Sequence, residues 1–116
     1  MSDSLKELTA RLRAFADARD WHQFHSPKNL AMAIAVEVGE LLEHFQWLTE
    51  EQSRSLTAEQ RQEIAYELAD ILNFMARLAD ELDVDLPTAA HEKVAFNEIR
   101  YPADKARGTA KKYTEL

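Results

Sequence analysis

Apolar side chains recur at helical spacing along most of the chain. They fall at every third or fourth position from about Leu5 to Asp20, which predicts an amphipathic helix. After a turn, Ser26-Pro27 is typical of a helix N-cap followed by proline at the first helical position. The apolar pattern then continues to about Leu48. Two helices are therefore predicted in the first part of the chain.

The second half of the chain contains two further helix start signals. Thr57 followed by Gln60 is typical of a capping box and predicts a third helix that extends to about Leu82. The sequence Asp-Leu-Pro at 85–87 opens a shorter fourth helix, which leads into a basic, irregular tail at about residues 100–116. The pattern predicts an all-α protein with a four-helix bundle-like fold.

The second and third predicted helices are apolar around most of their circumference. A helix of this kind has to be covered on several sides, and four helices from a chain of 116 residues can hardly supply that cover alone. We therefore expect a homo-oligomer, either a homotetramer built as a dimer of dimers or a homodimer. A loosely packed, aggregation-prone monomer is the alternative.

Two pairs of acidic residues interrupt these same apolar helices. Glu37 and Glu40 lie in the second helix, and Glu67 and Asp70 lie in the third. A step of three residues advances a helix by about 300° and about 4.5 Å, so each pair projects from nearly one face. If the two helices pack, four carboxylates meet in a poorly solvated interior, where they must either take up protons or hold a cation. Oxygen ligands suit Mg²⁺ or Mn²⁺ better than zinc or copper.

Composition narrows the class of protein further. With 46% hydrophobic residues and few helix breakers, the chain is expected to form one domain over residues 1–116. The net charge is −7, and because the segment 100–116 carries a net +3, residues 1–99 carry −10. So acidic a body argues against binding to nucleic acid. No cysteine is present, which excludes disulfides and thiol nucleophiles.

The chain lacks the sequence features of membrane insertion or export. No signal-peptide pattern follows Met1, and the longest apolar run, residues 30–36, is too short to cross a bilayer. We expect a soluble, cytoplasmic protein without a membrane partner. Two other chemistries are excluded: no histidine follows a glutamate by three residues, as di-iron bundles require, and two glycines cannot build a P-loop. A non-enzymatic helical interaction module remains the alternative.

The motifs taken together resemble the MazG-like, all-α nucleoside triphosphate pyrophosphohydrolases, and within them the dCTP pyrophosphatase branch. The similarity extends from residue 5 onward, with 26 residues between the two acidic motifs. The motifs that carry it are Arg19-Asp20-Trp21, Phe24-His25, Lys28-Asn29-Leu30, Glu37-Val-Gly-Glu40, Phe45-Gln-Trp47, Glu67-Leu-Ala-Asp70, Val84-Asp-Leu-Pro87, Arg100-Tyr-Pro102 and Lys112-Tyr-Thr-Glu-Leu116.

The resemblance implies an enzyme and its metal. Such proteins bind Mg²⁺, with Mn²⁺ as a substitute, through four acids that correspond to Glu37, Glu40, Glu67 and Asp70, which are also the catalytic residues. They cleave a nucleoside triphosphate between the α and β phosphates to give the monophosphate and pyrophosphate. For this chain the implied substrate is dCTP or a modified pyrimidine deoxynucleotide, and the implied role is sanitation of the nucleotide pool.

The resemblance also implies which residues bind the substrate. Aromatic faces stack on a nucleobase, which assigns Trp21, His25 and Trp47 to base binding. Lys93, Asn97 and Arg100 follow one another at steps of four and three on the fourth predicted helix, and their equivalents help to hold the triphosphate. The same matching motifs add three more residues to the substrate-binding set: Lys28, Asn29 and Tyr101.

Overall fold

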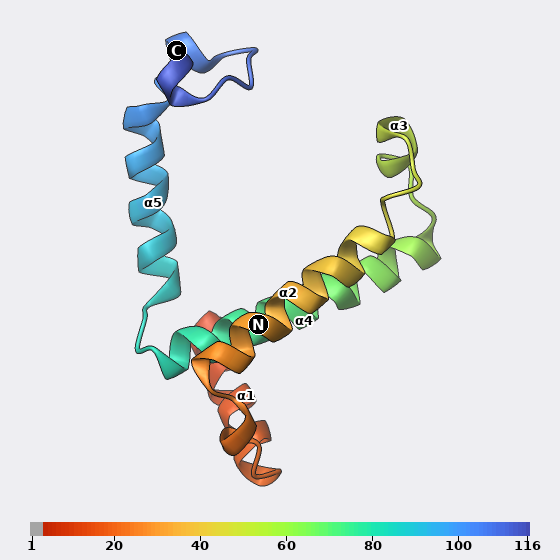
Figure 1. Cartoon of the computed structure of the whole chain (residues 1–116), viewed down its shortest axis with the longest axis vertical. Helices are drawn as coiled ribbons and strands as arrows, with labels where there is room; N and C mark the ends of the chain where they lie inside the picture. Colours follow the sequence, from red (N-terminus) through yellow and green to blue (C-terminus); the bar gives the residue numbers. More distant parts are fainter. Residues whose placement is uncertain (1–3) are drawn as a thin grey trace. The chain divides into compact units, whose positions relative to one another are not determined.

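The structure is a computed structural model that describes residues 4–116, and within that range it consists of helices and turns without a strand. The all-α prediction is confirmed. Four long helices account for most of the chain, as Figure 1 shows: α1 (Leu5–Ala18), α2 (Pro27–Glu43), α4 (Ala58–Glu81) and α5 (Leu86–Arg100).

Side-chain caps set the starts of these helices where the sequence predicts them. Ser26 accepts a hydrogen bond from the Asn29 N–H at 3.1 Å, with proline in the first turn of α2. Thr57 and Gln60 form both hydrogen bonds of a capping box at the start of α4. Asp85 accepts from the Thr88 N–H before α5. Each cap satisfies backbone donors that the first helical turn leaves unpaired.

Two helix ends come earlier than predicted. The first helix stops at Ala18 rather than Asp20, because Asp20 takes a left-handed backbone conformation with φ of 53°. The second stops at Glu43, and the prediction of Leu48 was wrong. The N–H groups of His44 and Phe45 bond to carbonyls three residues back, which tightens the last turn and ends the helix. Trp47 therefore lies in a turn and not on the helix.

Several short elements were not predicted. A one-turn helix, α3 (Glu50–Ser53), follows a second capping box between Thr49 and Gln52. A 3₁₀ turn, η1 (His22–Phe24), joins α1 to α2. The tail predicted to be irregular contains α6 (Ala103–Ala106) and η2 (Tyr113–Glu115).

The chain divides into two compact units, one ending at Asp83 and the other comprising Val84–Leu116. In the first unit α4 packs against both α1 and α2, and Figure 1 shows α2 and α4 running side by side in opposite directions. The second unit holds α5, α6 and η2. The four-helix bundle arrangement and the single domain over residues 1–116 stay predictions.

The buried core of the described residues is small. Its apolar members are Ala16, Leu30, Ile64 and Ala76, and many large apolar side chains on α2 and α4 remain exposed. No helix in residues 4–116 is long and apolar enough to span a lipid bilayer. The exposed apolar surface is the feature that the sequence pattern of the second and third helices predicts.

Candidate metal centre and nucleotide site

Antiparallel packing of α2 on α4 brings three of the four predicted acids together. One carboxylate oxygen each from Glu37, Glu67 and Asp70 lies within 4.8 Å of the other two. Glu37 comes from α2, and the other two come from successive turns of α4. The spacing of three residues therefore places Glu67 and Asp70 on one face of α4, as the sequence predicts, and Glu37 meets them from α2. Glu40 does not belong to this group of three, although it influences the electrostatics of Glu37.

The cluster contains carboxylate oxygens that are buried without a partner. Oε2 of Glu37 and Oε2 of Glu67 are both inaccessible and accept no hydrogen bond within the described residues. A buried acceptor without a donor costs free energy, and a charged one costs more. Among the described residues, no arginine forms an ion pair with Glu37 or Glu67. An all-oxygen donor set of this kind fits Mg²⁺ or Mn²⁺, so the residues present match the cation that the family resemblance implies.

The protonation of Glu37 reflects this crowding. Burial, followed by the nearby carboxylates of Glu40, Asp70 and Glu67, raises the pKa of Glu37 from 4.5 to about 7. Without a cation, Glu37 therefore holds a proton for much of the time near neutral pH. A divalent cation in the cluster would reverse this effect, because positive charge favours the ionised carboxylate.

His44 is a neighbour of the cluster that the motif analysis missed. Its Nε2 lies 3.6 Å from Oε1 of Glu67, and its Nδ1 lies 4.0 Å from Oε2 of Glu63. His44 follows Glu37 by seven residues, which is two helical turns, so the spacing was a signal that could have placed it on the same face. It supplies a polar neighbour to Glu67.

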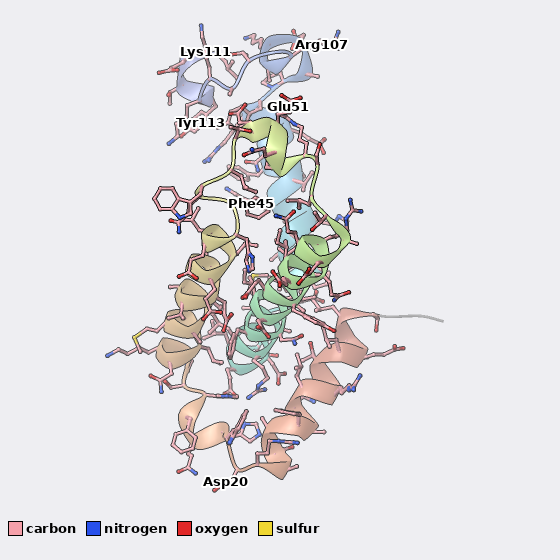
Figure 2. All side chains as sticks on the ribbon, turned by 90° about the vertical axis from the view of Figure 1, so that its right-hand side faces the viewer. Asp20, Phe45, Glu51, Arg107, Lys111 and Tyr113 are labelled. Atoms are coloured by element: carbon pink, nitrogen blue, oxygen red, sulfur yellow. The ribbon has the colours of Figure 1, made fainter. Side chains whose placement is uncertain are left out.

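The aromatic residues predicted to bind the base lie in two groups at the two ends of α2. Trp21 contacts Phe15 edge to face at 5.6 Å between ring centroids and His25 at 6.1 Å. Trp47 is 86% exposed in the turn after α2. Figure 2 shows Asp20 and Phe45, neighbours of the two groups, far apart along the first unit. The structure therefore brings Trp21 and His25 together but does not bring Trp47 to them.

In the turn before α2, one of the residues predicted to bind the substrate makes a structural hydrogen bond. The Asn29 side chain donates to the Phe24 carbonyl at 3.0 Å and so fixes the turn to the first turn of α2. Lys28 is exposed next to it.

Burial lowers the pKa of His25, and the positive charge of Arg77 is the second cause. Its Nδ1 is buried without a hydrogen-bond partner.

The predicted phosphate-binding residues of the second unit form a cluster of cations and aromatic rings. The Arg100 guanidinium lies 4.6 Å from the centre of the Phe96 ring and 4.8 Å from that of Tyr113. Lys93 approaches the same Phe96 ring at 5.5 Å, and Tyr101 contacts Tyr113 at 5.9 Å. The Asn97 carbonyl accepts the Tyr101 N–H at 2.7 Å. The four predicted residues thus lie along the second half of α5 and at its exit, where Tyr113 contacts two of them, Arg100 and Tyr101.

A separate groove lies between the start of α1 and the middle of α4. It has a volume of about 620 Å³ and is lined by Ser4, Leu5, Glu7, Leu8, Arg11 and Leu72. None of the predicted site residues lines it. The groove is apolar and lacks the convergent carboxylates, so we place the candidate chemistry at the acid cluster instead.

Comparison with known proteins agrees with these features. The profile of the MazG-like family matches residues 32–116. Human dCTP pyrophosphatase 1 is 46% identical over 109 residues, which cover 91% of this chain and 64% of the human protein. The bovine protein of the same name is 44% identical over 118 residues, covering 99% of this chain and 70% of its own length.

A solved structure shares the fold. A pyrophosphatase from Archaeoglobus fulgidus superposes with a TM-score of 0.81 at 36% identity, covering 88% of this chain and 95% of that one. The chain belongs to the MazG-like family. The mammalian relatives confirm its resemblance to the dCTP pyrophosphatase branch. The chain spans 64% of the length of the human protein.

Proposed function

We propose that this chain is a divalent-cation-dependent nucleoside triphosphate pyrophosphohydrolase. The observation that carries the proposal is the cluster of Glu37, Glu67 and Asp70, with two buried and unpartnered oxygens, in a chain 46% identical to human dCTP pyrophosphatase 1. The proposed substrates are dCTP and modified pyrimidine deoxynucleotides. The proposed biological role is removal of such nucleotides from the pool.

In the proposed mechanism, the clustered acids both bind the cation and activate the attacking water. Glu37, Glu67 and Asp70, with Glu40 as a fourth ligand, would hold Mg²⁺ or Mn²⁺. The bound cation would neutralise charge on the phosphate oxygens and polarise groups that contact it. Glu37 or Glu40 orients the attacking water and accepts its proton, because a carboxylate within hydrogen-bond reach of that water can act as its general base. Water adds at phosphorus, the bond between the α and β phosphates breaks, and pyrophosphate leaves.

The remaining predicted residues bind the rest of the nucleotide. Lys93, Asn97, Arg100 and Tyr101 are proposed to meet the phosphates, with Lys28 and Asn29 contributing from the start of α2. Trp21 and His25 are proposed to stack on the base, and Trp47, at the other end of α2, is proposed to reach the base that is bound by a neighbouring chain of the oligomer. Arg100 suits its role because a planar guanidinium can bind phosphate oxygens in pairs.

Product analysis with a substrate panel tests this function. Purified protein is incubated with Mg²⁺ and each of dCTP, 5-substituted dCTP, dTTP, dATP, dGTP and CTP, and products are resolved by ³¹P NMR. We expect the monophosphate and pyrophosphate in equal amounts, fastest from dCTP and its modified forms. Release of orthophosphate, or no turnover with any nucleotide, would contradict the proposal.

Trp47→Ala is expected to raise KM more than it lowers kcat. The side chain is 86% exposed, so its removal sacrifices almost no packing. Stacking that is equal in the ground state and the transition state changes KM alone. Steady-state kinetics with dCTP and thermal melting check this together. A variant that loses several degrees in Tm but keeps its KM would show that Trp47 is a structural residue.

A homo-oligomer is the proposed assembly, either a dimer or a dimer of dimers. Large apolar side chains of α2 and α4 are exposed in the single chain, among them Met32, Val36, Leu42, Leu68 and Tyr66. A surface of this kind marks an interface in a folded protein. Light scattering coupled to size-exclusion chromatography is expected to give a mass two or four times 13.3 kDa. A mass of one chain at micromolar concentration would refute the assembly.

A further inference from the structure

Arg77 is the buried charged side chain of the described residues. It lies near the end of α4, two turns beyond Asp70, and is only 3% exposed. Its Nη1 donates to Oδ2 of Asp80 at 3.1 Å, and its Nη2 donates to Oε1 of Glu81 at 2.9 Å. A buried guanidinium is stable only when it is paired and hydrogen-bonded in this way. The catalytic scheme above makes no use of this residue.

Asp80 extends the network from α4 to α1. Arg13 on α1 donates to both of its oxygens, through Nε at 3.0 Å and Nη2 at 2.6 Å. This two-point contact is the strongest geometry for an arginine and a carboxylate. The hydrogen bond from Arg13 is the largest cause of the lowered pKa of Asp80. Asp80 therefore stays ionised between two guanidinium groups, and its hydrogen bonds from Arg13 connect α4 to α1.

His22 extends the network to the aromatic turn. Its Nδ1 lies 3.2 Å from Nη2 of Arg77, whereas Oε1 of Glu81 is farther away at 3.7 Å. Arginine can only donate, so Nδ1 of His22 must be the acceptor. The ring proton then resides on Nε2, which faces the carboxylate of Asp17 on α1. One imidazole thus joins α4 to α1, and its tautomer follows from the geometry.

The turn that His22 anchors carries the residues proposed to stack on the base. Trp21 immediately precedes it, and His25 follows η1. Trp21 is 42% exposed, with Phe15 and His25 each in edge-to-face contact with its ring. On a short turn, an exposed ring keeps a fixed orientation only if neighbouring residues are held.

We propose that Arg77 is a positioning residue for nucleotide binding, which acts through His22 to hold the turn at residues 21–25 so that Trp21 and His25 meet the substrate base. The inference rests on the proposed function, because that function assigns Trp21 and His25 to the base. Arg77 itself does not touch the nucleotide. Its effect is to lower the entropy lost when the aromatic turn is ordered on binding.

His22→Ala is the sharpest test of this role. The side chain is 40% exposed, so its removal leaves no large cavity, and the pairs of Arg77 with Asp80 and Glu81 remain. We expect KM for dCTP to rise about fivefold with kcat within about twofold, since ordering a released side chain on binding carries an entropy cost of this size. His22→Asn should restore part of the loss, because its Oδ1 can accept from Arg77. His91→Ala, an exposed histidine on α5, is the matched control.

Two spectroscopic readouts separate positioning from general destabilisation. In a Trp47→Phe background, Trp21 is the single fluorophore of its kind, since the sequence has two tryptophans. Acrylamide quenching of Trp21 is expected to increase in His22→Ala and in Arg77→Lys. In the wild type, ¹⁵N NMR of His22 is expected to show the proton on Nε2.

The possible outcomes separate a failure of this inference from a failure of the proposed function on which it rests. Unchanged KM and unchanged quenching in His22→Ala, in a protein whose wild type releases pyrophosphate, would overturn the positioning role and leave the function intact. A loss of Tm with wild-type KM would likewise overturn it, because Arg77 would then be only structural. A wild type that releases no pyrophosphate from any nucleotide would remove the proposed function, and the inference with it.

Discussion

Asp70→Asn is expected to lower kcat for dCTP hydrolysis by at least about 10³-fold, since catalytic groups that act as one unit fail together when one is lost. Asp70 is the exposed member of the three clustered acids, and the substitution keeps its size while removing its charge. Without metal, the variant should be as stable as the wild type or more so, because one source of like-charge repulsion on Glu37 disappears. Pyrophosphate release and thermal melting with and without Mg²⁺ measure both effects.

Two further variants make this result specific. Glu59→Gln neutralises an exposed acid in the first turn of the same helix, outside the cluster, and is expected to keep wild-type kcat. Glu40→Gln tests the acid that lies outside the group of three, and we expect it to lose turnover as Asp70→Asn does. Near-wild-type pyrophosphate release by Asp70→Asn would show that the cluster does not carry the chemistry.

The stability of the metal-free protein is expected to fall as pH rises from about 4.5 to about 7. The pKa of Glu37 is 4.5 in its ordinary state and about 7 in the folded chain. The folded state therefore binds more protons in this range, which means that unfolding becomes easier as pH increases. The full shift corresponds to about 3 kcal/mol, and partial solvation of the cluster reduces this to about 1–2 kcal/mol. A fall in Tm of several degrees between pH 5 and pH 8 should result, by the usual relation of Tm to free energy, roughly 4 °C per kcal/mol.

The Glu37→Gln variant isolates this contribution. Groups outside the acid cluster titrate equally in both proteins, so the difference between the two melting curves as a function of pH reports Glu37 together with the carboxylates that interact with it. Mg²⁺ is expected to raise Tm of the wild type more at pH 8 than at pH 5, since cation and proton compete for the same oxygens. Parallel pH profiles for the two metal-free proteins would show that Glu37 has an ordinary pKa and that the cluster is well solvated.

The helix starts were predictable because they are local. Ser26, Thr57 and Asp85 each bond a backbone N–H three residues away, and such contacts involve no other part of the chain. The helix end at Glu43 was not predictable from periodicity, because apolar residues continue through the following turn to Leu48. Thr49 and Gln52, which cap α3, have the same pattern as Thr57 and Gln60 and could have been recognised.

The geometry of the candidate site was likewise predictable only in part. Spacing within one helix determined that Glu67 and Asp70 share a face, and the opposing face of α2 supplied Glu37. Periodicity does not show that Glu40 lies outside that group, or that His44 lies beside Glu67. Both depend on how α2 and α4 are rotated and shifted against each other, which side-chain packing sets.

The sequence by itself determined the four long helices of this protein, their starting residues and the pair of acidic faces, because each depends on contacts within a few residues. Only the tertiary structure decided which oxygens are buried without a partner and how Arg77 connects α1, α4 and the aromatic turn. The physical reason is that burial and pairing of charges between helices arise from packing between distant segments, and a one-dimensional pattern does not contain the distance between residues 22 and 77.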